Sequence, residues 1–394
     1  MGVVGVICEY NPLHSGHAWM LRKLREQGAE AIVCAMSGNF VQRGEAAVVG
    51  KLARAEMALR CGADLVLEIP TPWAAATAET FARGGAAVLR RTGVVTELAF
   101  GAECGDVDAL ASVADALDGE AYRAALRAVP EDGATFAARR QAAVAAVLDE
   151  ERASLLSQPN NILGVEYLRA IRGMGIRPIV IQRRGAAHDA PDAAEGIASA
   201  SLVRRLLLSG KTEEAVAYLP PEAAAILARE MERGRAPADM RRCDRAVLAR
   251  LRRMEEEEWA RYDGGGEGLY HRLYQAVREA RSVEELLEGA KTKRYPMARL
   301  RRAVLAAWLE LPAVPEEVPY LRLLGANQTG RKLLRQMRGA PVLTKAADVA
   351  KLGEAAEELF RRESRWSDLY ALTCPAVLPC GEDWRTTPIL MDEK

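Results

Sequence analysis

The first 26 residues place a strand, a sharp turn and a helix in direct succession. Residues 3–8 form an apolar run that predicts a buried strand, and Asn11-Pro12 ends it. Residues 18–26 are helix formers, so a helix follows the turn. Because such a unit buries a strand beneath a helix, a chain that repeats it is constrained to an α/β fold with a parallel sheet.

Two of the four histidines of the chain, His14 and His17, lie where this strand passes into the helix. The first turn of a helix has unpaired N–H groups and the positive end of the helix dipole, which favour anions. Gly16 removes a side chain where a phosphate would approach closely. Both imidazoles can donate to phosphate oxygens as pyrophosphate leaves. This arrangement predicts an ATP site, and the alternative is a corner whose histidines only cap the helix.

The first half of the sequence alternates short apolar runs with amphipathic helical patterns. The expected strands cover residues 3–8, 31–36, 64–69, 94–100 and 178–181, and the expected helices cover 18–26, 51–60, 73–90 and 106–117. This alternation predicts a Rossmann-like parallel sheet covered by helices on both faces, with ligands beyond the carboxyl ends of its strands.

Beyond residue 210 the patterns are helical, with no convincing strand before the tail. They cover residues 212–230, 239–261, 268–289, 295–310 and 345–361. We therefore expect two parts: a catalytic domain over residues 1–210, with a helical insertion at about 106–172, and an α-helical domain over 211–394.

The amino-acid composition limits which binding partners and which cellular compartment we expect for the protein. Lys plus Arg equals Asp plus Glu at 54 each, so an RNA-binding surface requires local segregation of charge. The seven cysteines are scattered and show no zinc-site spacing, and free thiols are typical of the reducing cytoplasm. Neither a leader peptide nor a membrane span is evident in the sequence. We expect a cytoplasmic protein without a metal site of its own.

Polar side chains follow the second expected strand in residues 36–44. Burying the polar side chains of such a loop costs free energy. The loop therefore lies either at a cleft or on an ordinary solvated surface. Lys51 and Arg54 open the next helix, where they either add positive charge to a phosphate site or are solvated. Asp64 and Glu68 flank the third strand and are expected to be structural. The loop residues expected near substrate are Ser37, Gly38, Asn39, Gln42 and Arg43.

A second helix N-terminus follows the last expected strand. Ser199 and Ser201 enter it, with Arg204 one turn further on. Serines are good N-caps, and a helix N-terminus with an arginine also holds phosphates, so the two interpretations are compatible. Residues 185–197 before it are expected to form a mobile loop over the site.

Several of these segments together resemble one family. The His-x-Gly-His signature is similar to that of the nucleotidyltransferase superfamily. Residues 9–12, 36–45, 62–70, 159–164, 197–204 and 292–295 resemble, in this order, the tRNA(Met) cytidine acetate ligases. The resemblance implies that ATP activates acetate as acetyl-adenylate. The acetyl group then passes to the wobble cytidine of elongator tRNA(Met), giving N4-acetylcytidine.

The resemblance also implies roles for individual residues, with ATP as co-substrate and Mg²⁺ neither required nor excluded. The implied catalytic residues are His14, His17, Ser201 and Arg204. The implied ATP-binding residues are Ile7, Glu9, Tyr10, Asn11, Pro12, His14, Gly16, His17, Met20, Gly101, Asn160, Asn161 and Arg183. From the residues alone, the two asparagines would be read as helix caps.

RNA recognition is expected in the helical half. Residues 291–302 contain six basic residues and no acidic one, and Tyr295 lies among them as a candidate for stacking on a base. A second basic face follows in residues 331–338. Each patch is alternatively a solvated face. The predicted RNA-binding residues are Lys291, Lys293, Arg294, Arg299 and Arg302.

Two other functions share some of these features. A small-molecule adenylyltransferase acting on a phosphorylated cofactor precursor would use the same histidine signature, but it does not need a long basic helical part. A non-catalytic RNA-binding protein would retain the fold without the catalytic residues. The presence of both histidines, Ser201 and Arg204 argues against this function.

Overall fold

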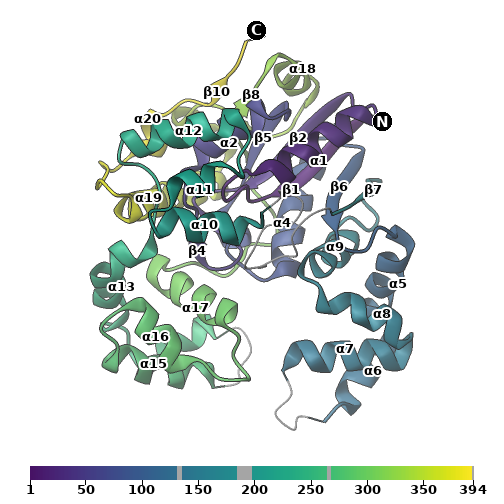
Figure 1. The fold of residues 1–394 in the computed structure, drawn as a ribbon, viewed down its shortest axis with the longest axis vertical. Coiled ribbons are helices and arrows are strands. Elements are labelled where there is room, and N and C mark those ends of the chain that lie inside the picture. Colours follow the sequence, from purple (N-terminus) through teal and green to yellow (C-terminus); the bar gives the residue numbers. More distant parts are fainter. Residues whose placement is uncertain (131–134, 184–197, 264–267, 393–394) are drawn as a thin grey trace.

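A computed structural model describes residues 1–130, 135–183, 198–263 and 268–392. Its centre is an eight-stranded sheet in the order β10-β8-β5-β2-β1-β6-β7, with β9 paired to β8 (Figure 1). The five expected strands all form and pair in parallel. They are β1 (Val3–Cys8), β2 (Ala31–Ser37), β5 (Leu65–Ile69), β6 (Glu97–Ala102) and β7 (Arg177–Gln182).

The strand order places a crevice beyond the carboxyl end of β1. The chain proceeds from β1 to β2 and β5 on one side, and later adds β6 and β7 on the other. Val6 consequently lies between Cys34 of β2 and Ala99 of β6. Ligands in such sheets bind where the strand order reverses. Neighbouring residues point to opposite faces, so Cys34 and Val33 belong to the two separate cores that cover the sheet.

Helices of the first half cover the sheet and form a lobe beside it. The covering helices are α1 (Ser15–Glu26), α2 (Lys51–Arg60), α3 (Thr71–Ala74) and α4 (Ala78–Arg91). The insertion contains α5 (Val107–Asp118), α6 (Glu120–Ala128), α7 (Phe136–Val147), α8 (Glu150–Ser154) and α9 (Pro159–Ala170). Because α4 packs on α9, the insertion is anchored to the sheet, and α6 and α7 extend away from it (Figure 1).

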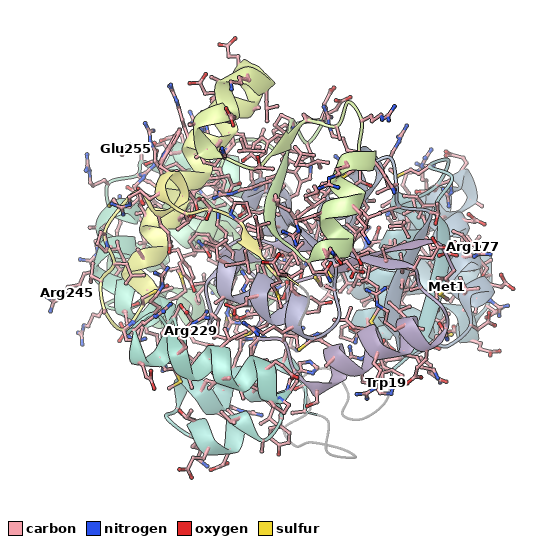
Figure 2. The ribbon with its side chains drawn as sticks, turned by 90° about the horizontal axis from the view of Figure 1, so that it is seen from above. Met1, Trp19, Arg177, Arg229, Arg245 and Glu255 are labelled. Atoms are coloured by element: carbon pink, nitrogen blue, oxygen red, sulfur yellow. The ribbon has the colours of Figure 1, made fainter. Side chains whose placement is uncertain are left out.

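The second half begins with helices on the opposite side. They are α10 (Ala200–Leu208), α11 (Thr212–Val216), α12 (Pro221–Glu232), α13 (Asp244–Leu251), α14 (Glu256–Trp259), α15 (Leu269–Glu279), α16 (Val283–Ala290) and α17 (Met297–Leu309). Figure 2 shows Arg245 of α13 and Arg177 of β7 on opposite sides of the molecule. The helical part and the insertion are therefore two lobes below one sheet.

The expectation of no strand between residue 210 and the tail is wrong. β8 (Leu321–Ala326) enters the main sheet antiparallel to β5, and β9 (Val342–Leu343) and β10 (Ile389–Leu390) pair with it. β8 was missed because Arg322 interrupts an otherwise apolar run, although every residue of the strand is buried. The remaining helices are α18 (Gln328–Gln336), α19 (Glu354–Tyr370) and α20 (Glu382–Arg385). The domain boundary at residue 210 stays a prediction.

A buried cluster of charges joins this late strand to the first half. The Lys51 Nζ lies 2.9 Å from Glu68 and 3.0 Å from Asp383, and Arg322 lies 2.9 Å from Asp383. Arg54 is also fully buried, and its Nε donates to a backbone carbonyl. Lys51 and Arg54 are therefore neither phosphate ligands nor solvated, because both side chains are buried and hydrogen-bonded inside the core. Glu68 is structural, as expected.

No helix in the described parts of the chain is both long and apolar enough to cross a membrane.

Candidate functional site

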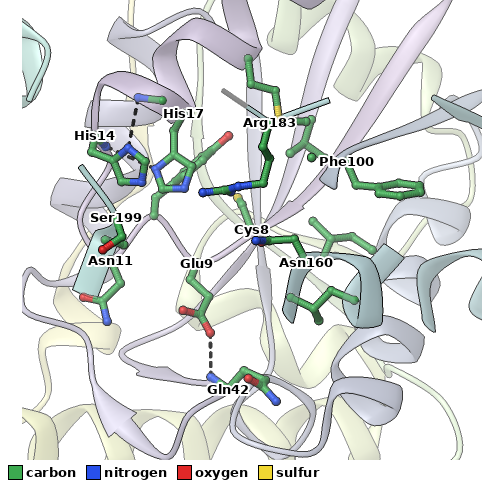
Figure 3. Close-up of a pocket in the computed structure, with 18 of the residues that line it drawn as sticks. Cys8, Glu9, Asn11, His14, His17, Gln42, Phe100, Asn160, Arg183 and Ser199 are labelled. Carbon is green, nitrogen blue, oxygen red and sulfur yellow. Dashed lines mark hydrogen bonds between the residues drawn. The ribbon is translucent and has the colours of Figure 1, made fainter. Parts of the chain in front are cut away.

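A cavity of about 190 Å³ lies at the carboxyl ends of β1 and β6 (Figure 3). The N-termini of α1 and α10 and parts of α4 and α9 complete its wall. Fifteen predicted site residues line it, although they are dispersed over almost 200 positions of the chain. These are Ile7, Glu9, Tyr10, Asn11, His14, Gly16, His17, Met20, Gln42, Arg43, Gly101, Asn160, Arg183, Ser201 and Arg204.

His14 and His17 both cap α1 through one ring nitrogen. The Nδ1 of His14 accepts the N–H of Gly16 at 3.1 Å, and the Nδ1 of His17 accepts the N–H of His14 at 3.3 Å. A neutral imidazole whose Nδ1 accepts carries its proton on Nε2. The rings pack against each other with their centroids 3.8 Å apart. Capping and anion binding are therefore not alternatives, because they use different nitrogens of the same rings.

The expected unpaired N–H groups are not found at the start of α1. The N–H of Ser15 donates to Tyr218, that of Gly16 to His14, and that of His17 to the carbonyl of His14. The imidazoles and the helix dipole remain as the contribution of α1 to an anion site. The reason is that the Tyr218 carbonyl, the His14 side chain and the His14 carbonyl each accept one of these N–H groups.

The start of α10 has the backbone donors that α1 lacks. Ser199 caps the helix by accepting the N–H of Leu202 at 3.2 Å, and its Oγ lies 3.0 Å from that of Ser201. In the described structure the N–H groups of Ala200 and Ser201 have no partner, and both residues line the cavity. Two helix N-termini without acidic residues in their first turns thus meet at one cavity, which favours a polyanion.

Two arginines border the same space. Arg204 donates to the carbonyl of Asn11 at 2.9 Å, which fixes its position beside the turn. The side chain of Arg183 makes no hydrogen bond or ion pair with the described residues, and it lies beside His17 (Figure 3). Burial lowers the pKa of Arg183, and the charge of Glu103 acts in the opposite direction. An anion in the cavity would add a further partner for the guanidinium.

His17 is electrically neutral in this environment. Its pKa is held well below the usual value, first by burial and then by the charges of His14 and Arg183. A neutral imidazole with its proton on Nε2 donates one hydrogen bond to an incoming phosphate.

Glu9 is the one carboxylate among the described residues that line the cavity. Its Oε1 accepts the N–H of Gln42 at 2.9 Å, which holds the loop after β2 against the turn after β1 (Figure 3). Burial raises the pKa of Glu9, whereas Arg204 and Arg43 act in the opposite direction. A carboxylate with a raised pKa is a better proton acceptor than an exposed one.

Sequence reasoning missed the apolar wall of the cavity. Phe81 of α4, Phe100 at the end of β6, and Leu163 and Tyr167 of α9 line it. A single sequence does not distinguish such residues from ordinary core residues. Strand ends and helix faces are apolar whether they line a cavity or pack in the core. The position of Phe100 directly before Gly101, at the carboxyl end of a strand, is the one signal that pointed to it.

Some predicted site residues lie outside the cavity lining. Asn161 accepts the N–H of Cys104 at 2.9 Å, and Asn39 accepts the N–H of Lys51 at 3.0 Å. Ser37 is fully buried, and a Cβ on Gly38 would lie 2.4 Å from Glu68. These residues shape the loop and helix that carry Gln42 and Asn160. Pro12 follows a cis peptide bond in the turn. The expected mobile loop at 185–197 falls outside the described residues.

The predicted RNA-binding residues differ in their surroundings. Lys293 and Arg294 are exposed, as is Lys291, which lies 3.6 Å from Glu288. Arg299 forms an ion pair with Asp263 at 3.2 Å. The side chain of Tyr295, the candidate for stacking on a base, is buried.

The second basic segment does not extend this surface. It belongs to α18, which lies at the opposite end of the molecule from α17 (Figure 1). Within it, Arg331 pairs with Asp392 at 2.6 Å.

The described residues contain no group of three or more His, Cys, Asp or Glu side chains that could hold a metal ion.

Comparison with known proteins agrees with the geometry. Residues 1–380 match the family model of the HIGH nucleotidyl transferases. The chain is 33% identical to the tRNA(Met) cytidine acetate ligase of Syntrophomonas wolfei, with 99% of both chains covered. It is 36% identical to the ligase of Fervidobacterium nodosum, covering 86% of this chain and 82% of the relative.

Two crystal structures of Thermotoga maritima TmcAL are similar over the full length of both chains at 32% identity. The TM-score is 0.95 for the apo form and 0.92 for the form bound with alpha-thio ATP. The chain therefore belongs to the HIGH nucleotidyltransferases and, among them, to the tRNA(Met) cytidine acetate ligase family.

Proposed function

We propose that the protein forms acetyl-adenylate from acetate and ATP and transfers the acetyl group to N4 of the wobble cytidine of elongator tRNA(Met). The observation that carries this proposal is the cavity at the end of β1. There, two helix N-termini, two imidazoles and the guanidinium groups of Arg183 and Arg204 border a space suited to a triphosphate. The family relatives support it, and none of those named above is an adenylyltransferase of cofactor precursors.

In the first step an acetate oxygen attacks the α-phosphorus of ATP, and the bond from that phosphorus to pyrophosphate breaks. The Nε2–H groups of His14 and His17 and the N–H groups at the start of α10 are placed to stabilise the charge that grows on the leaving group. Arg183 and Arg204 add positive charge at the same place. The apolar wall formed by Phe100, Leu163 and Tyr167 suits the adenine ring or the acetyl methyl group.

In the second step the cytidine N4 attacks the acetyl carbonyl carbon, the bond to AMP breaks, and N4 loses one proton. Glu9 is placed to accept that proton, because it borders the cavity and its pKa is raised by burial. Mg²⁺, if used, would act through the ATP phosphates. The free cysteines agree with action in the reducing cytoplasm.

The test is product analysis. The protein is incubated with ATP, labelled acetate and tRNA(Met), and the tRNA is digested to nucleosides for mass spectrometry. We expect labelled N4-acetylcytidine from the wobble position, dependent on both ATP and acetate. Transfer of AMP to a phosphorylated small molecule, or tRNA binding without any acetylation, would contradict the proposal.

A further inference from the structure

A second cavity, of about 1200 Å³, opens between the two lobes. Its walls come from the start of α7 in the insertion, from the connection into α4, and from α17 in the helical part (Figure 1). Small-molecule sites usually enclose about 300 to 1,000 Å³. This larger and open cleft suits a segment of a macromolecule.

The charges of the cleft favour an anionic occupant. Six arginines and three carboxylates are among its described lining residues. Two of the carboxylates are already neutralised, Glu310 by Arg250 at 2.7 Å and Asp263 by Arg299 at 3.2 Å. These two pairs also occupy Arg250 and Arg299, and Arg362 pairs with Glu358 at 2.7 Å. The lining still contains more arginines than carboxylates, which favours a chain of phosphates.

Among the arginines that line the cleft, Arg302 is the best placed to bind an anion. It makes no hydrogen bond or ion pair with the described residues, although it is half-buried in the wall. Burial and the charge of Arg299 lower the pKa of Arg302 to about 10. A phosphate in the cleft would provide the missing counter-charge.

Phe136 supplies the second kind of contact. It is the first residue of α7, where the Thr135 side chain caps the helix, and its ring is 60% exposed in the cleft wall. An exposed aromatic ring opposite arginines is the combination that binds unpaired nucleotides, whose bases stack and whose phosphates pair with cations.

The cleft adjoins the ATP cavity along two segments. Thr80 lines the cleft, and the next residue, Phe81, lines the ATP cavity. In the loop after β2, Arg43 lines the ATP cavity, and the neighbouring Gly44 packs against Arg302, where a Cβ would lie 2.5 Å from the backbone nitrogen. The cleft and the ATP cavity therefore lie on two sides of the same segments, α4 and the loop after β2.

We propose that the anticodon loop of the tRNA lies in this cleft, with Phe136 of the insertion stacked on an unpaired base and Arg302 bound to a phosphate. This assigns the helical insertion as a second RNA-binding element. The inference rests on the proposed function, because it takes the tRNA as substrate.

The test compares Phe136→Ala, Phe136→Trp and the unsubstituted protein in binding an anticodon stem-loop RNA. Loss of one base–aromatic stack should raise the Kd about 5- to 150-fold, whereas Trp should retain the affinity. The slope of log affinity against log salt should not change in Phe136→Ala, because no charge is lost. In Arg302→Gln the slope should fall by about 0.7 to 0.9. Leu148→Ala is the matched control, since Leu148 is an exposed residue of the insertion that does not line the cleft.

Unchanged RNA affinity in Phe136→Ala would overturn the proposal. So would a change only in oligomeric state, measured by light scattering, because that result would assign the cleft to a second copy of the chain. Acetate-dependent pyrophosphate exchange without tRNA should equal that of the unsubstituted protein in the Phe136 variants. Absence of exchange in the unsubstituted protein would instead contradict the proposed function, so the two failures are distinguishable.

Discussion

The imidazole rings of His14 and His17 lie with their centroids 3.8 Å apart and their planes tilted by 34°. Each ring accepts a backbone N–H through Nδ1, so each carries its proton on the opposite nitrogen. The same two side chains therefore close the first turn of α1 and present donors to the cavity.

The pH dependence of stability should report the neutral state of His17. Its pKa is lowered in the folded protein, so between that pKa and the unfolded value of about 6.5 only the unfolded state binds the proton. The free energy of unfolding should therefore fall as the pH drops below about 6.5. His17→Gln should lose less stability over the same interval in urea denaturation. Parallel pH curves for the two proteins would contradict a neutral His17.

Replacement of Arg183 should separate ATP binding from stability. Arg183→Gln removes a charged donor of the cavity, worth about 1.5 to 3 kcal/mol, so kcat/KM for ATP should fall roughly 10- to 150-fold. The free energy of unfolding should change little, because no hydrogen bond or ion pair joins the guanidinium to another described residue and the charge of Glu103 has a smaller effect on its pKa than burial has. Arg177→Gln is the control, since Arg177 begins β7, the strand that ends directly before Arg183, and pairs with Glu97. A loss of stability without a change in ATP kinetics would show that Arg183 stabilises the fold and does not bind ATP.

Glu9 should act in acetyl transfer and not in adenylate formation. Glu9→Gln keeps an oxygen that can accept the N–H of Gln42, so the loop should remain in place. Loss of the proton acceptor should slow transfer from preformed acetyl-adenylate by about 10² to 10⁴. Single-turnover kinetics measure both steps. Transfer at the unsubstituted rate would exclude Glu9 as the acceptor.

The exposed basic residues before α17 should affect tRNA binding alone. In Lys293→Gln with Arg294→Gln, each lost phosphate contact should weaken tRNA binding and lower the salt slope by about 0.7 to 0.9. Acetyl-adenylate formation should be unchanged. Arg299 is left intact because its ion pair with Asp263 stabilises the helical part. Lys211→Gln is the control at an exposed lysine remote in sequence from this segment. Unchanged affinity in the double variant would make this segment a solvated face.

Local patterns predicted the five parallel strands well, although some of them pair with strands that are distant in the sequence. The β1–turn–α1 unit and the strand ends after it were recognisable because apolar runs, breakers and helix formers follow one another directly. β8 was not, because Arg322 inside the strand is neutralised by Asp383, a residue distant in the chain. An ion pair between residues so distant in the chain cannot be detected from the local periodicity of apolar residues.

The residues of the site were also only partly predictable from the sequence. Polar residues of the turn and of α10 could be predicted, since their types and positions suit phosphate chemistry. Lys51 and Arg54 look like phosphate ligands in the sequence, but the fold buries both of them. Phe100 and Tyr167 look like core, but they line the cavity. Which charged and apolar residues border the space depends on the packing of α4 and α9, and that packing is a tertiary property.

The central claim is that the cavity beside His14 and His17 forms acetyl-adenylate. Acetate-dependent exchange of pyrophosphate into ATP, measured without tRNA, tests it most directly. The unsubstituted protein should catalyse exchange, and His17→Ala should reduce the rate by about 10² to 10³, as for loss of one preorganised donor. The double variant His14→Ala, His17→Ala should be at least as impaired while it remains folded by circular dichroism. Near-normal exchange in the folded double variant would contradict the account.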